Sequence, residues 1–127
     1  MYYIGIDISK FKHDCAVIDD SGEIVTPSWS FTNDAEGFSQ LKLLLNSLDT
    51  ETRIGLESTG HYGMNLKLFL ESNNFSFMEF NPLLINRFVK SKSLRKTKSD
   101  SIDCMMIAHY LMTVAVSYTH LRAHETL

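Results

Sequence analysis

The chain has 127 residues, of which 44% are hydrophobic and 21% are charged. This length supports one domain, or a piece of a larger protein, and the composition excludes collagen-like, disordered and disulfide-scaffold proteins. The formal net charge of −3 gives by itself no indication of a nucleic-acid partner. The sequence has no leader-like start and no membrane-length apolar stretch, and Cys15 and Cys104 form no C-x-x-C pair. It therefore predicts a cytoplasmic protein with reduced cysteines and no membrane association.

The first quarter of the chain predicts three strands joined by tight turns. Residues 2–7, 13–19 and 23–31 are rich in β-forming residues, and the turn-forming Asp20-Ser21-Gly22 precedes the third run. Pro27 within that run predicts an edge strand or a bulge, because proline cannot donate a hydrogen bond to a neighbouring strand. The chain therefore opens with an antiparallel meander.

The hydrophobic pattern then changes to the period of a helix. Asn33 is the expected N-cap, and Glu36 three residues later would complete a capping box. Apolar residues follow at helical spacing: Phe38, Leu41, Leu45 and Leu48.

Strands and helices alternate over the rest of the chain. Strands are predicted over 53–57 and 75–80, with a helix over 62–71 between them. Asn81-Pro82 predicts the start of another helix, because proline is favoured at the first helical position. A last helix is expected to begin near Asp100. The order βββαβαβαα is that of the RNase H-like fold, an α/β mixed sheet with helices on its faces.

Four carboxylates lie at special positions in this scheme. Asp7 and Glu57 end predicted strands, and sites in open sheets gather beyond such strand ends. Asp100 and Asp103, three residues apart, would share one face of the last helix. Clustered carboxylates repel one another unless a cation offsets their charge, and hard oxygen ligands select Mg²⁺ or Mn²⁺. Two such ions roughly 4 Å apart support phosphodiester chemistry.

Simpler interpretations of the same four residues stay open. Asp100 and Asp103 are also typical helix-capping residues. Asp7 could belong to a turn, and Glu57 could be an exposed strand end. The functional interpretation therefore depends on all four acids converging.

Basic residues are concentrated between residues 81 and 99, a stretch without any acidic residue. The rest of the chain has six basic against fifteen acidic residues. The stretch is a candidate phosphate-binding surface, the simpler alternative being a solvated loop. Its basic residues are Arg87, Lys90, Lys92, Arg95, Lys96 and Lys98.

The motifs resemble, in order and spacing, the N-terminal domain of DEDD-type insertion-sequence transposases. The matching segments are GIDISK at 5–10, LESTGHYG at 56–63, NP at 81–82 and KTKSDSIDCMMIAHYL at 96–111. The resemblance implies a RuvC-like domain of the RNase H-like fold over residues 1–115. It also implies a tetrad of acids that binds divalent metal and supports DNA cleavage and strand exchange. The tetrad falls on Asp7, Glu57, Asp100 and Asp103.

The resemblance carries further expectations about partners. DNA is the implied substrate, a guide (bridge) RNA is used by some members of the family, and strand exchange implies a homo-oligomer of the full-length protein. His61 and Tyr62, within the second motif, are candidates for contact with nucleic acid. The simpler interpretation makes them ordinary residues at a helix start.

The end of the chain departs from the family pattern. Residues 116–127, VSYTHLRAHETL, resemble translated adapter or vector sequence, which predicts a non-family tail on a truncated chain. The family's C-terminal domain, which bears the proposed serine nucleophile, has no counterpart. The chain is therefore expected to be inactive alone.

Two alternative functions remain from the sequence. The chain could be a non-catalytic DNA- or RNA-binding remnant. It could also be an actin-like ATPase or sugar-kinase domain, since those folds open with a similar G-I-D strand. The bulky segment Ile8–Phe11 argues against the ATPase or sugar-kinase alternative, because such domains have a glycine-rich phosphate loop at this position.

Overall fold

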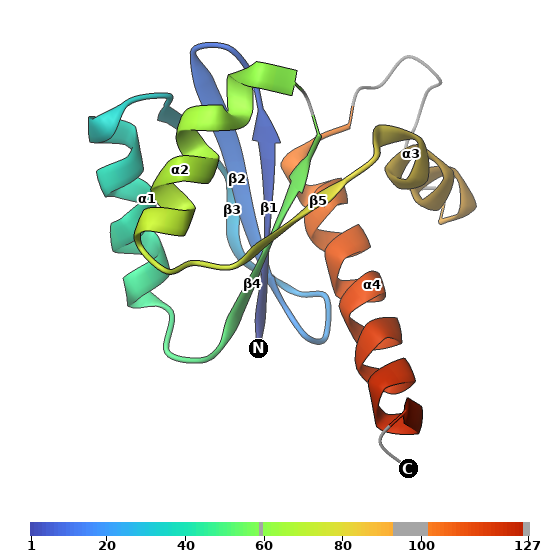
Figure 1. Cartoon of the computed structure of the whole chain (residues 1–127). Coiled ribbons are helices and arrows are strands. Elements are labelled where there is room, and N and C mark those ends of the chain that lie inside the picture. Colours follow the sequence, from blue (N-terminus) through green and yellow to red (C-terminus); the bar gives the residue numbers. More distant parts are fainter. Residues whose placement is uncertain (59, 93–101, 126–127) are drawn as a thin grey trace.

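A five-stranded mixed sheet is the centre of the computed structural model, which describes residues 1–58, 60–92 and 102–125 (Figure 1). In the sheet order β3-β2-β1-β4-β5, β1 is antiparallel to β2 and parallel to β4. β2 and β3 are antiparallel, and β4 and β5 are parallel. The strands are β1 Tyr2–Ile8, β2 Lys12–Asp19, β3 Ile24–Thr32, β4 Thr52–Glu57 and β5 Phe77–Phe80.

Helices cover both faces of the sheet. Helices α1 and α2 lie on one face, and α3 and α4 lie on the other (Figure 1). The helical segments are α1 Ala35–Ser47, the 3₁₀ turn η1 Gly60–Gly63, α2 Met64–Ser72, α3 Pro82–Ser91 and α4 Cys104–Glu125. Within the described ranges, none of these helices has the length and apolar character needed to cross a membrane.

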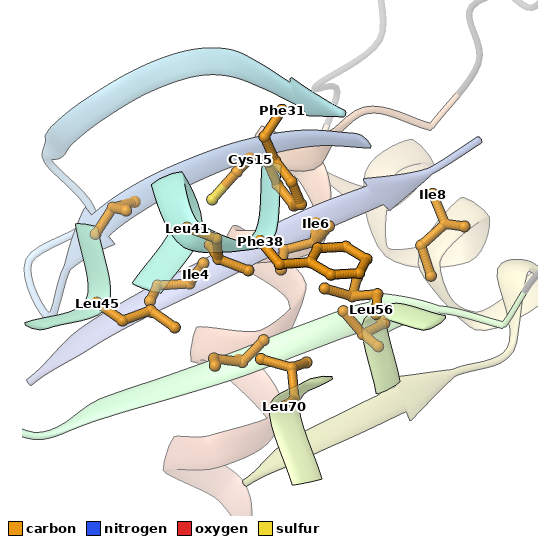
Figure 2. Close-up of a cluster of buried hydrophobic side chains, with 13 residues drawn as sticks. Ile4, Ile6, Ile8, Cys15, Phe31, Phe38, Leu41, Leu45, Leu56 and Leu70 are labelled. Atoms are coloured by element: carbon orange, nitrogen blue, oxygen red, sulfur yellow. The ribbon is translucent and has the colours of Figure 1, made fainter. Parts of the chain in front are cut away.

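The core beneath α1 and α2 follows from the two-residue period of the strands. Ile4, Ile6 and Ile8 of β1 point to this face because alternate strand residues share a side. They pack against Phe38 and Leu41 of α1, and Figure 2 shows this cluster. The helix therefore buries the apolar stripe that its sequence spacing predicted.

On the opposite face of the sheet, two glycines allow α4 to approach the strands closely. Gly5 and Gly55 are paired residues of the parallel strands β1 and β4. A Cβ atom at Gly5 would lie 2.1 Å from the carbonyl oxygen of Cys104 and 2.4 Å from the amide nitrogen of Ala108. A Cβ atom at Gly55 would lie 3.3 Å from Leu111. The backbone of α4 thus packs directly on the sheet, and its first turn lies beside the ends of β1 and β4.

The predicted α/β architecture with an antiparallel opening and helices on both faces is confirmed, and so is the order of its elements. β3, which contains Pro27, is an edge strand, and its pairing with β2 is irregular near Val17. Both cysteines are buried and free, as expected.

Two predicted helix starts are wrong. The N-cap of α1 is Asp34, whose side chain accepts from the Gly37 amide, and not Asn33. The last helix begins at Cys104 and not near Asp100, so Asp103 precedes the helix. The prediction placed the helix start too early because Asp100 and Asp103 are both residues that can cap a helix.

Candidate active site

Asp7 and Glu57 lie together at one edge of the sheet. Each follows a paired glycine by two residues, so both acids share the face that α4 covers. β1 and β4 are parallel, which brings their carboxyl ends to the same edge. Both residues are half-buried.

Asp103 reaches the same edge from the start of α4. One of its carboxylate oxygens accepts a hydrogen bond from the Met106 amide at 2.9 Å, and its carbonyl accepts from the Ile107 amide at 3.1 Å. The capping interpretation is therefore correct for this residue. It is compatible with a second role, because Asp103 also acts electrostatically on Asp7.

Asp14 is a fourth acid at this position, and the sequence reasoning missed it. It lies in β2 directly opposite Asp7 in the antiparallel pair, and it accepts a hydrogen bond from the Ser30 hydroxyl. The available signal was the register of the first hairpin, in which Ile8 pairs with His13 and Asp7 therefore pairs with Asp14.

The surroundings of Asp7 raise the pKa of its carboxyl group. Partial burial is the largest cause, and the charges of Glu57, Asp14 and Asp103 add to it in that order of effect; together they raise the pKa of Asp7 to about 6. Like charges in a partly desolvated site disfavour the ionised form. The site is therefore a concentration of negative charge, and the Cys104 thiol lies near enough to feel the charges of Asp103, Asp14 and Asp7. Within the residues described, no three His, Cys, Asp or Glu side chains are grouped closely enough to hold a metal ion.

The fourth predicted acid, Asp100, lies outside the described residues, as do the predicted nucleic-acid contacts Arg95, Lys96 and Lys98. Arg87, Lys90 and Lys92 are exposed on α3 or at its end. Ile85 and Val89 of the same helix are buried against α4, so the basic side chains lie on its solvent side. Their contact with nucleic acid stays a prediction.

Most of the chain is similar to known transposases and pilin gene-inverting proteins. A family model described as a transposase, of the IS110 DEDD type, matches residues 4–126. The pilin gene-inverting proteins of Moraxella lacunata and Moraxella bovis are 33% and 34% identical over 111 and 112 residues, 85% of this chain. A mini-circle putative transposase for IS117 of Streptomyces coelicolor is 27% identical over 129 residues, 98% of the chain. The matched region is 33% of each pilin-inverting protein and 30% of the Streptomyces protein, so the chain spans about a third of these relatives.

Proposed function

This chain belongs to the IS110-type family of DEDD transposases, and from that membership we propose that it is the metal-binding catalytic part of an enzyme that cuts and exchanges DNA strands. Membership of a transposase family argues against the alternative of an actin-like ATPase or sugar-kinase domain. The observation that supports the proposal is the position of Asp7 and Glu57 at the neighbouring carboxyl ends of β1 and β4, with Asp103 near enough to act on Asp7 electrostatically.

The donor set fits a hard divalent cation. The proposed ligands are carboxylates, and a cation among them would offset both the burial and the like charges that raise the pKa of Asp7. We propose Asp7, Glu57, Asp100 and Asp103 as the residues that hold Mg²⁺ or Mn²⁺. When bound, the metal would stabilise the charge that develops on the phosphodiester oxygens.

The chain's own contribution is the placement of these acids. The glycine pair lets α4 approach the sheet, and the Asp103 cap fixes the side chain at the start of the helix. One oxygen of the Asp103 carboxylate is engaged by the Met106 amide, which orients the group while its other oxygen can serve as a ligand.

Mn²⁺ binding by isothermal titration tests the proposal directly. We expect the wild-type chain to bind Mn²⁺ and Asp7→Asn to weaken binding at least tenfold. Asp20→Asn is the matched control, because it removes the same charge from an exposed turn at the other end of β2. Equal isotherms for the three proteins, or no binding by wild type, would remove the metal site.

The substrate is the second part of the proposal. We propose DNA as the substrate because the family consists of transposases, and because Arg87, Lys90 and Lys92 present cations on α3. The same cations support nucleic-acid binding even without catalysis, so binding that weakens steeply with salt is expected in either case. A guide RNA and a homo-oligomer of the full-length protein stay predictions from the resemblance.

A further inference from the structure

Two exposed aromatic side chains lie in loops that leave the acidic edge of the sheet. Phe11 is 75% exposed in the loop between β1 and β2, four residues after Asp7. Tyr62 is 39% exposed in η1, five residues after Glu57. A single exposed aromatic residue is unremarkable on a protein surface. Two of them beside the candidate active site require a closer examination of how they are held.

Asn33 joins the two loops. Its backbone amide donates to the carbonyl of Phe11 at 2.9 Å. Its side-chain amide donates to the carbonyl of Lys10 at 3.1 Å and to that of Tyr62 at 3.4 Å. The backbones that carry the two rings are therefore fixed around one side chain, although they are about fifty residues apart in sequence. This role also explains why Asn33 does not cap α1.

A cation lies beside the Phe11 ring, and a second ring lies beside Tyr62. The Lys10 ammonium lies 5.0 Å from the centre of the Phe11 ring, within range of a cation–π interaction. The rings of His61 and Tyr62 lie 4.5 Å apart. Exposed aromatic rings with adjacent cations are the usual means of binding unpaired nucleotides, because rings stack on bases and cations neutralise phosphates.

We propose that Phe11 and Tyr62 form a stacking platform for unpaired bases of the strand whose backbone approaches Asp7. The inference rests on the proposed function, since it names the form in which that site takes its substrate. Unpaired bases fit better than a duplex, because bases inside a duplex have both faces covered by their neighbours. Single-stranded DNA and single-stranded RNA share this chemistry, and the experiment distinguishes them.

Fluorescence anisotropy with labelled 12-nucleotide DNA, the same sequence as RNA, and the DNA duplex tests the platform on the whole chain. We expect wild type to bind a single strand more tightly than the duplex. Phe11→Ala and Tyr62→Ala should each weaken single-strand binding about fivefold or more, as stacking contacts do. Tyr62→Phe keeps the ring and should retain affinity.

Leu43→Ala is the matched control, because Leu43 is 72% exposed on α1 and its loss removes an equally accessible apolar group. Preference for DNA or for RNA identifies the strand. Equal affinity of Phe11→Ala, Tyr62→Ala and Leu43→Ala for both single strands would overturn the platform, as would duplex binding by wild type as tight as single-strand binding. These outcomes are independent of the Mn²⁺ titration with Asp7→Asn, so the platform and the metal site can fail separately.

Discussion

Replacing Gly5 with alanine tests how the site is assembled. The added methyl would lie 2.1 Å from the Cys104 carbonyl oxygen and 2.4 Å from the Ala108 nitrogen, where ordinary contacts begin at 3.4 Å. Both obstacles are backbone atoms, so no side-chain rotation relieves the overlap and α4 must move by more than an ångström. Overpacking a core typically costs about 1–3 kcal/mol. We expect a loss near 3 kcal/mol in the free energy of unfolding, because the helix carries the buried Ile107 and Leu111 away with it.

Urea unfolding followed by circular dichroism measures this loss. Gly63→Ala is the control, because its added methyl would meet only the tip of the Ile8 side chain, at 2.8 Å, which can rotate away. That variant should lose less than about 1 kcal/mol. If Gly5→Ala unfolds at the same urea concentration as Gly63→Ala, the helix is not held against the sheet as described and the reasoning is refuted.

Three further changes have defined outcomes. Asp7→Asn should stabilise the metal-free protein at pH 7.5, because the folded state raises the pKa of this acid from 3.8 to about 6. That rise corresponds to about 3 kcal/mol for a fully buried carboxylate, which solvent screening at a half-buried position lowers to about 1–2 kcal/mol. The cost to the wild type is absent below pH 3.8, grows as the pH rises from there to about 6 and is complete above it, so thermal unfolding in EDTA should show the gain only at the higher pH. Asp34→Ala should lower the Tm by removing the α1 cap, whereas Asp34→Asn should nearly preserve it, since asparagine caps as well; equal Tm values for both variants would contradict this. Neutralising Arg87 and Lys90 to glutamine should weaken DNA binding for every sequence and reduce the salt dependence by about one phosphate contact each, with Lys42→Gln on α1 as the charge control.

The elements were predictable because local patterns and tertiary packing agree over most of the chain. The alternating residues of β1 and the spaced leucines of α1 bury as their periods require. The cap of α1 was mispredicted because Asn33 and Asp34 are equally good caps in isolation. The choice between them depends on the carbonyls of Lys10 and Tyr62, which engage Asn33 from distant parts of the sequence.

The acidic site was only partly predictable for a similar reason. Asp7 and Glu57 could be found because strand ends are visible in the sequence. Asp14 could not be found in that way, since its position opposite Asp7 depends on the register of the hairpin. The start of α4 was predicted too close to Asp100, because a cluster of capping residues does not by itself indicate which one caps the helix.

The glycines explain what the motifs alone did not. Gly-x-acid occurs in β1 and again in β4, and the two-residue period places each glycine and its acid on one face. The glycines allow α4 to pack closely on the sheet, and Asp103 at the start of this helix acts electrostatically on Asp7. A change at Gly5 should therefore weaken stability and Mn²⁺ binding together, because it displaces Asp103 along with α4. A change at Asp7 should separate the two, raising metal-free stability while removing metal affinity. The Gly5 and Asp7 variants should therefore change the metal-free stability in opposite directions, while both lose Mn²⁺ affinity. This combination is expected only if Gly5 serves the packing of α4 and Asp7 serves the binding of the metal.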